Sequence, residues 1–156
     1  MKLGLMLAFL IMSQVALAET IRGKQIKAEM VTRVDSLITK ITDSRDALYR
    51  EDVITACEKI NEIFKILPDH LVSIGTRMNL FDPKVVRMEQ ETKMFLIYIH
   101  QRSNICASGE NTGENLDLNE TEKKLKSMSK MLVKQKKRIK KSSTEYNNTY
   151  NYYYEF

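Results

Sequence analysis

The residue types that usually perform chemistry are few in this sequence, and their spacing assembles no catalytic motif. The chain has two histidines, His70 and His100, and neither has a second metal ligand close by in the sequence. There is no phosphate-binding loop, no metal-ligand spacing and no Gly-x-Ser-x-Gly elbow. His70 follows Pro68 and Asp69, which predicts a surface loop, whereas His100 is expected beside the core or at its rim. These observations indicate a protein that is not an enzyme and has no metal site.

Positive charge is concentrated near the end of the chain. Residues 121–141 carry ten bases and one acid, whereas residues 107–120 carry four acids and no base. The densest part of this basic segment comprises Lys134, Lys136, Lys137, Arg138, Lys140 and Lys141. Such a run can bind phosphates, acidic lipids or an acidic protein by simple electrostatics. The other interpretation is a solubilising helix end, because lysines near a C-terminus also suit the helix dipole.

The sequence contains two cysteines, Cys57 and Cys106. Both fall on apolar stripes, and an antiparallel hairpin that turns near residue 78 would place residue 57 opposite residue 99. Cys106 is about two helical turns from that position. Residues 1–18 predict export, as described below, and two cysteines in one exported domain are usually paired. We therefore predict a Cys57–Cys106 disulfide. Two buried free thiols are the alternative, and a redox-active pair is not expected because Cys-x-x-Cys is absent.

Four amphipathic segments must position these residues. Apolar positions recur mainly at intervals of three, four or seven residues, which is the spacing of the seam in a helical bundle. The predicted core positions are Ile26, Met30, Val34, Leu37, Ile41 and Leu48; Val53, Cys57, Ile60, Phe64 and Leu67; Val85, Met88, Thr92, Phe95, Ile99, Arg102 and Cys106; and Leu125, Met128, Leu132, Gln135 and Ile139. Four such segments with short connections predict an all-α, up-down-up-down four-helix bundle.

The boundaries of the segments follow from capping residues and prolines. The second segment is expected to end at Pro68, because proline disrupts a helix interior. The third begins at Asp82, a helix-capping residue that is followed by Pro83 at the first helical position. The fourth is expected to follow Asn119 or Thr121.

The two ends of the chain differ from this helical part. Lys2, an apolar run from Leu3 to Met12 and the sequence Ala16-Leu17-Ala18 are typical of a cleavable signal peptide. The apolar run is shorter than the roughly 20 residues that a membrane span needs. We therefore predict a signal peptide at 1–18 and a bundle at 19–141, with no transmembrane segment after cleavage. The expected location is the periplasm (or the medium, if secreted), so a nucleic-acid partner is not expected.

The segment 142–156 is rich in asparagine and holds five of the seven tyrosines. It shows neither a helical nor an alternating pattern. Polar-aromatic tails of this kind are usually disordered, and we expect the same of this tail.

Three stretches of the chain share a pattern with a known helical family. They are Met30-x-Thr32 to Leu37 followed by Asp43, then Val53 to Pro68, and Pro83 to the loop Ala107-Ser108-Gly109-Glu110. In this order they resemble the soluble periplasmic b-type cytochromes, and the similarity covers most of residues 25–138. The resemblance implies a four-helix bundle.

The same resemblance bears on a haem cofactor. That family holds haem between a methionine on the first helix and a histidine near the end of the fourth. Met30 falls on the methionine position, but Val133 stands at the histidine position and has no lone pair for iron. We therefore expect no cofactor, and a function in binding an unknown protein or anionic surface. The alternative is a haem electron-transfer protein that uses Met30 and His100, although an up-down count places these two residues at opposite ends.

We expect the mature chain to begin at Glu19, because signal peptidase cleaves after a small-x-small sequence such as Ala16-Leu17-Ala18. Mass spectrometry of the exported protein measures this directly. Recovery of an intact Met1 in the exported fraction would contradict the prediction.

Overall fold

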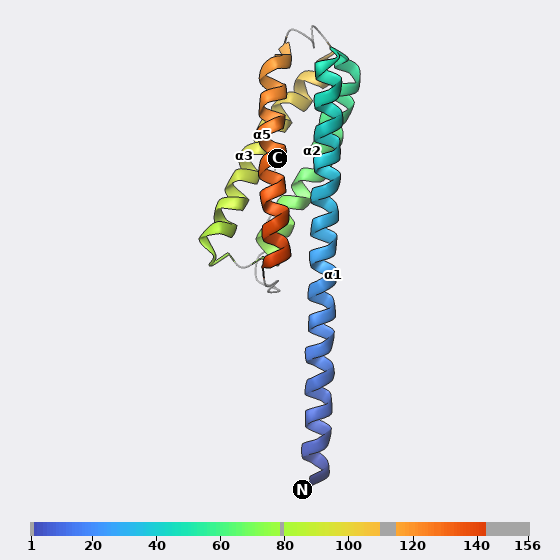
Figure 1. The fold of residues 1–156 in the computed structure, drawn as a ribbon, viewed down its shortest axis with the longest axis vertical. Helices are drawn as coiled ribbons and strands as arrows, with labels where there is room; N and C mark the ends of the chain where they lie inside the picture. Colours follow the sequence, from blue (N-terminus) through green and yellow to red (C-terminus); the bar gives the residue numbers. More distant parts are fainter. Residues whose placement is uncertain (1, 79, 110–114, 143–156) are drawn as a thin grey trace.

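The computed structural model describes residues 2–78, 80–109 and 115–142, and of residues 2–21 it describes the backbone alone. In these ranges the chain forms four long helices: α1 (Lys2–Tyr49), α2 (Val53–Arg77), α3 (Pro83–Ser108) and α5 (Leu118–Lys141). The helices run alternately up and down (Figure 1), and α1 packs against both α2 and α5 while α2 packs against α3. The predicted all-α, up-down-up-down bundle is confirmed. Apart from Ser142, the predicted tail lies outside the described residues.

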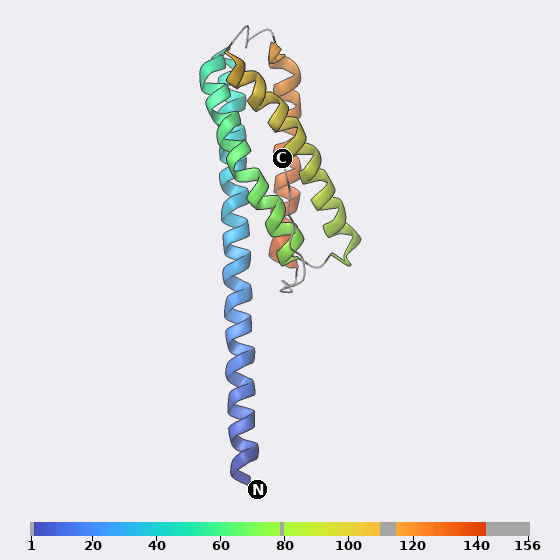
Figure 2. The ribbon, with the colours of Figure 1, turned by 180° about the vertical axis from the view of Figure 1, so that it is seen from behind.

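Helix α1 is longer than its three partners. Its N-terminal part projects alone beyond the end of the bundle, as the view from behind also shows (Figure 2). From residue 22 on, where the structure describes the side chains, the first buried position of α1 is Ile26. The predicted cleavage point after Ala18 lies on the projecting part. Within the part of the chain that the structure describes, no helix is long and apolar enough to cross a membrane.

The core follows the predicted stripes closely on α1 and α5. Every predicted core position of these two helices is buried, including the polar Gln135. On α2 the predicted positions Cys57, Ile60 and Leu67 are buried. Phe64 is only partly buried, and its neighbour Ile63 is fully buried in its place. Thr92 occupies the centre of the α3 stripe and is fully buried. Two polar side chains on facing stripes therefore sit inside the bundle.

Helix α2 continues through Pro68 to Arg77, so the predicted end of the second helix at Pro68 is wrong. A proline inside a helix costs about 3 kcal/mol. Beyond it, however, Leu71, Ile74 and Met78 maintain the apolar spacing, and all three are buried. Full burial of each such side chain contributes roughly 1.5–3 kcal/mol. Together these side chains outweigh the cost of the proline.

The starts of α3 and α5 are fixed by aspartates. As predicted, Asp82 caps α3, where its carboxylate accepts a hydrogen bond from the backbone N–H of Lys84 at 2.9 Å and Pro83 takes the first helical position. Helix α5 begins earlier than predicted, after Asp117, whose carboxylate accepts a hydrogen bond from the N–H of Glu120 at 3.0 Å. These caps satisfy backbone donors that the first turn of a helix leaves free.

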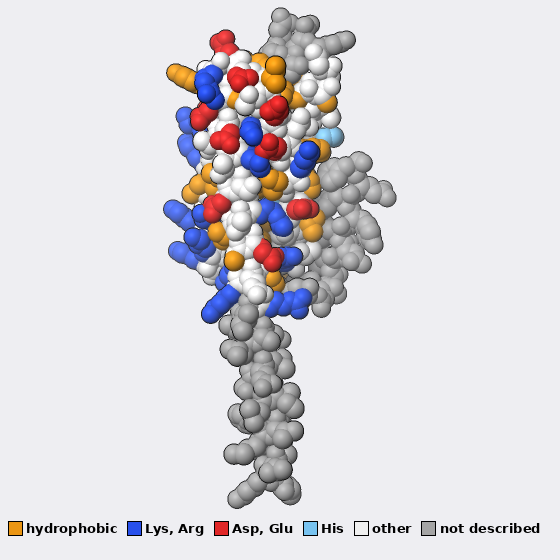
Figure 3. Space-filling model, turned by 90° about the vertical axis from the view of Figure 1, so that its right-hand side faces the viewer, with side chains coloured by type: hydrophobic (Ala, Val, Ile, Leu, Met, Phe, Trp, Pro, Cys, Tyr) orange, Lys and Arg blue, Asp and Glu red, His pale blue; other side chains and the backbone are white. Residues whose placement is uncertain are grey.

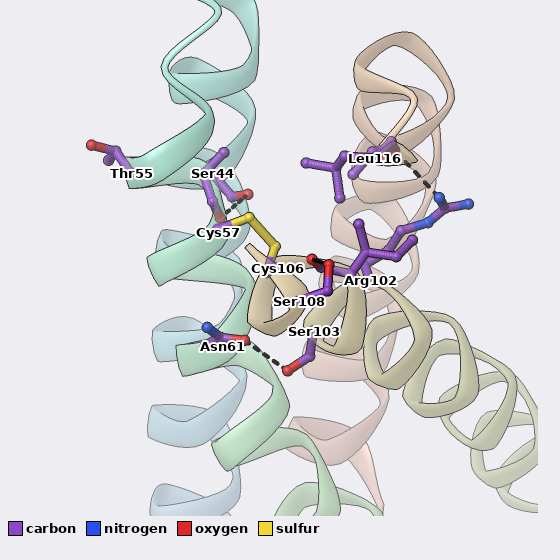
Figure 4. Close-up of a disulfide and its surroundings, with 12 residues drawn as sticks. Ser44, Thr55, Cys57, Asn61, Arg102, Ser103, Cys106, Ser108 and Leu116 are labelled. Carbon is purple, nitrogen blue, oxygen red and sulfur yellow. Dashed lines mark hydrogen bonds between the residues drawn. A yellow bond between two sulfur atoms is a disulfide. The ribbon is translucent and has the colours of Figure 1, made fainter. Parts of the chain in front are cut away.

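The predicted Cys57–Cys106 disulfide is present and joins α2 to α3 (Figure 4). The two Cα atoms are 5.4 Å apart, within the usual range for a disulfide. One turn further along α2, the hydroxyl of Ser103 donates a hydrogen bond to the side-chain oxygen of Asn61 at 2.7 Å. The bond and its polar neighbour fix the upper end of the α2–α3 pair.

We expect the double variant Cys57→Ala, Cys106→Ala to unfold more easily than the parent chain. The disulfide closes a loop of 49 residues, and in the chain-entropy model its removal costs about 4 kcal/mol of unfolding free energy. Urea denaturation with and without a reductant measures this loss. The reductant should destabilise the parent and leave the double variant unchanged. Alkylation of both cysteines in the folded, unreduced parent would contradict the bond.

Candidate anion-binding surface

Helix α5 presents opposite faces to the core and to solvent. Its buried side chains are Thr121, Leu125, Met128, Met131, Leu132, Gln135 and Ile139. Its outer face carries six exposed lysines: Lys123, Lys126, Lys130, Lys134, Lys137 and Lys141. At about 100° per residue these six lie within an arc of about 80°, in a row about 27 Å long that contains no acid. Figure 3 shows Lys and Arg side chains protruding along the edge of the bundle on the α5 side. We call these six residues the lysine row.

At the lower end of the bundle the lysine row borders a hollow of about 420 Å³. The hollow lies between the start of α3 and the end of α5. It is lined by Asp82, Lys84, Lys134, Lys137, Arg138, Lys141 and Ser142. Five of these side chains are basic and one is acidic, and the charge of the site is therefore strongly positive. We call it the basic hollow.

The basic hollow lies between α3 and α5, which are packed less closely than the other neighbouring helices. The backbones of α1–α2, α1–α5 and α2–α3 are in close contact, whereas α3 and α5 meet mainly through longer side chains. At the hollow, the guanidinium of Arg138 donates a hydrogen bond to the backbone carbonyl of Lys84 at 2.8 Å. This bond ties the two helices together at their ends and holds Arg138 at the wall of the hollow.

The six basic residues that the sequence predicted as one anion-binding cluster do not all lie together in the structure. Lys134, Lys137, Arg138 and Lys141 line the basic hollow. Lys140 is exposed but lies outside it. Lys136 faces α1 and forms an ion pair with Asp35, at 2.5 and 2.7 Å from the two carboxylate oxygens. Lys136 thus joins α5 to α1 and does not belong to the hollow, which corrects its expected place in one cluster.

The sequence interpretation missed Lys84 and the upper three members of the lysine row. Lys84 directly follows the Asp82–Pro83 helix start, and in an antiparallel bundle the start of the third helix lies beside the end of the fourth. The upper lysines recur at intervals of three and four residues, which is the spacing of one helical face. Both signals were present in the sequence.

A buried hydrogen-bond network sets the position of α5. The side-chain amide of Gln135 donates to the hydroxyl of Thr92 at 2.9 Å and to the carbonyl of Met88 at 3.3 Å, both on α3. Its oxygen is 2.9 Å from Nε2 of His70 on α2. Because the Thr92 hydroxyl donates to the Met88 carbonyl, a reversed amide would place three oxygens together. Gln135 is therefore fixed in one orientation between three helices.

His70 is fully buried inside α2, so the predicted placement in a surface loop is wrong. Because the Gln135 oxygen can only accept, Nε2 of His70 must carry the proton that it donates. Nδ1 has no hydrogen-bond partner among the described residues. Burial lowers the pKa of His70 to about 4, and the nearby positive charge of Arg33 acts in the same direction, while the hydrogen bond to Gln135 opposes it. His70 is accordingly neutral at pH 7.

The residues considered for haem lie at different levels of the bundle. Met30 is fully buried on α1, where the neighbouring Arg33 donates a hydrogen bond to the Asp69 carbonyl of α2 at 3.1 Å. His100 is half-buried and stacks on Phe64 with ring centroids 5.2 Å apart. Residues 64 and 69 are about 8 Å apart along a helix axis, and Met30 lies still lower, since Arg77 pairs with its neighbour Glu29.

This arrangement bears on the haem alternative. Two axial ligands of one iron must face each other at a common level, and Met30 and His100 do not. Val133, at the family's histidine position, is 41% exposed on the outside of α5. Among the side chains that the structure describes, no group of three His, Cys, Asp or Glu could hold a metal ion.

Comparison with family models, with curated proteins and with solved structures finds no match for this chain.

Because His70 is buried, we expect the free energy of unfolding to decrease as the pH is lowered below neutral. Its pKa is about 4 in the folded protein and about 6.5 in the unfolded chain. Between these values only the unfolded chain binds the proton, so the free energy of unfolding should fall by about 3 kcal/mol as the pH drops from about 6.5 to 4. In His70→Leu this contribution should vanish, whatever the stability of the variant at pH 7. Urea denaturation at several pH values measures the slope.

His100→Gln is the matched control for this experiment, because His100 is half-buried at the rim. Loss of the slope in this variant, with retention in His70→Leu, would contradict the assignment to His70. An unchanged slope in His70→Leu would show that other groups cause the loss.

Proposed function

We propose that this chain is an exported, non-catalytic helical-bundle protein that binds an anionic protein or surface through α5. The observation that carries this proposal is the uncompensated positive charge of the lysine row and the basic hollow. Five basic side chains and one carboxylate line the hollow. Helix α5 has no acidic residue between Lys123 and Lys141, the two ends of the lysine row. Such a concentration of one charge attracts anions and steers their approach.

The distribution of acids on α5 supports binding over mere solubility. Where α5 meets α1, its charged side chains are paired: Lys136 with Asp35, and Glu122 with Arg45 at 2.6 Å. On its outer face no such pairing is present among the described residues. A surface that serves solubility alone is best built from interspersed charges of both signs. Because the six lysines of the row carry the same charge, they repel one another, and a bound anion would reduce this repulsion.

Two further observations support export. A disulfide is typical of an oxidising compartment, and Cys57 and Cys106 are bonded. Every buried side chain that the structure describes on α1 lies at Ile26 or beyond, so cleavage after Ala18 would leave the described core intact. The proposal is a haem-free protein with the shape of the periplasmic b-type cytochromes, located in the periplasm or secreted. A nucleic-acid partner is not part of it.

Reversal of three charges at the hollow tests the proposed function. The parent chain should bind vesicles that contain phosphatidylglycerol at low salt and release them at high salt, because exposed charges are screened. In Lys134→Glu, Lys137→Glu, Lys141→Glu, binding in a sedimentation assay should fall at least tenfold while the circular dichroism stays helical. The matched control is Lys24→Glu, Lys27→Glu, Lys65→Glu, which changes the net charge equally on α1 and α2. Absence of binding by the parent at low salt would refute an anionic-surface partner.

A further inference from the structure

We infer that the basic hollow is a binding site for a compact anion that carries two or more phosphate groups. This inference rests on the proposed anionic-partner function and deepens it. It names the class of ligand, and it adds Lys84 of α3 to the binding residues of α5. The hollow is an open surface depression of about 420 Å³, which has room for a ligand of this kind.

The charges of the hollow suit more than one phosphate group. Its lining contains four lysines and one arginine against one carboxylate, that of Asp82. This carboxylate already accepts a hydrogen bond from the N–H of Lys84 at 2.9 Å, so it is held at the helix cap. The net charge is therefore four positive charges. A phosphate monoester carries about −1.5 to −2 at pH 7, so two or three such groups would balance the site.

The arginine of the hollow is held in place by a neighbouring backbone group. One nitrogen of Arg138 is anchored to the Lys84 carbonyl, which limits the motion of the guanidinium. A planar guanidinium can bind two phosphate oxygens at once, whereas a lysine acts as a mobile point charge. Because Lys84 and Arg138 come from α3 and α5 and both line the hollow, one ligand would contact both helices.

A flat anionic surface is a different kind of partner, and it would use different residues. A membrane would touch the whole lysine row, including the upper members Lys123, Lys126 and Lys130. An anion in the hollow would use the lower members Lys134, Lys137 and Lys141, together with Lys84 and Arg138. The two halves of the row are matched, since each contributes three exposed lysines to the same face of one helix.

Calorimetric titration of the full mature chain with sodium tripolyphosphate tests the inference. At 0.1 M sodium chloride we expect saturable binding at one equivalent. Orthophosphate and sulfate, at equal ionic strength, should bind at least tenfold more weakly. The variant Lys134→Gln, Lys137→Gln, Lys141→Gln should lose at least tenfold in affinity. The matched control Lys123→Gln, Lys126→Gln, Lys130→Gln should lose less than threefold. Lys84→Gln should lose about threefold or more, because it lies in the hollow though not on α5.

Three outcomes would overturn the inference, and they separate it from the proposed function. Equal losses in the two triple variants would show diffuse attraction to the row; the site would be rejected and the anionic-partner function retained. Binding of phosphatidylglycerol vesicles without saturable tripolyphosphate binding would point to a membrane surface in place of the hollow. If neither the vesicles nor tripolyphosphate bind the parent chain, both proposals fail. Circular dichroism of each variant identifies any loss of folding.

Discussion

The position of α5 depends on one buried amide. Gln135 must satisfy its donors and its acceptor away from water, and an unsatisfied buried amide costs roughly 1–3 kcal/mol. Thr92 and Met88 on α3 accept from it, and Nε2 of His70 on α2 donates to it. A rotation of α5 by one residue, about 100°, would break all of these bonds. The amide therefore sets the rotation of the helix that carries the charge.

That rotation determines where each neighbouring lysine points. Lys134 and Lys136 lie about 100° to either side of Gln135 on the helix. Lys136 turns toward α1 and meets Asp35, whereas Lys134 turns toward α3 and lines the basic hollow. Two basic residues that lie only two positions apart in the sequence thus have different roles. Lys136 forms a structural ion pair, and Lys134 belongs to a surface that anions can reach.

The sequence predicted the bundle well because helical periodicity is a strong, local signal. The stripes of α1 and α5, the Asp82 cap and the Cys57–Cys106 bond all follow from spacing. The predicted end of α2 was wrong because a local rule about Pro68 was given more weight than the apolar spacing beyond it. The same error placed His70 in a loop. The basic hollow could be predicted only in part, since it combines α5 with Lys84 of α3, and the pairing of Lys136 depends on tertiary contacts.

The two ends of the bundle are stabilised in different ways. At the upper end, covalent and ionic contacts accumulate: the Cys57–Cys106 disulfide joins α2 to α3, and Arg45 pairs with Glu122 between α1 and α5. At the lower end of the α3–α5 seam, the hydrogen bond from Arg138 to the Lys84 carbonyl lies among like charges. Mutual repulsion there weakens the closure of α3 on α5. A multivalent anion would replace this repulsion with attraction to both helices, so binding at this place would also stabilise the fold.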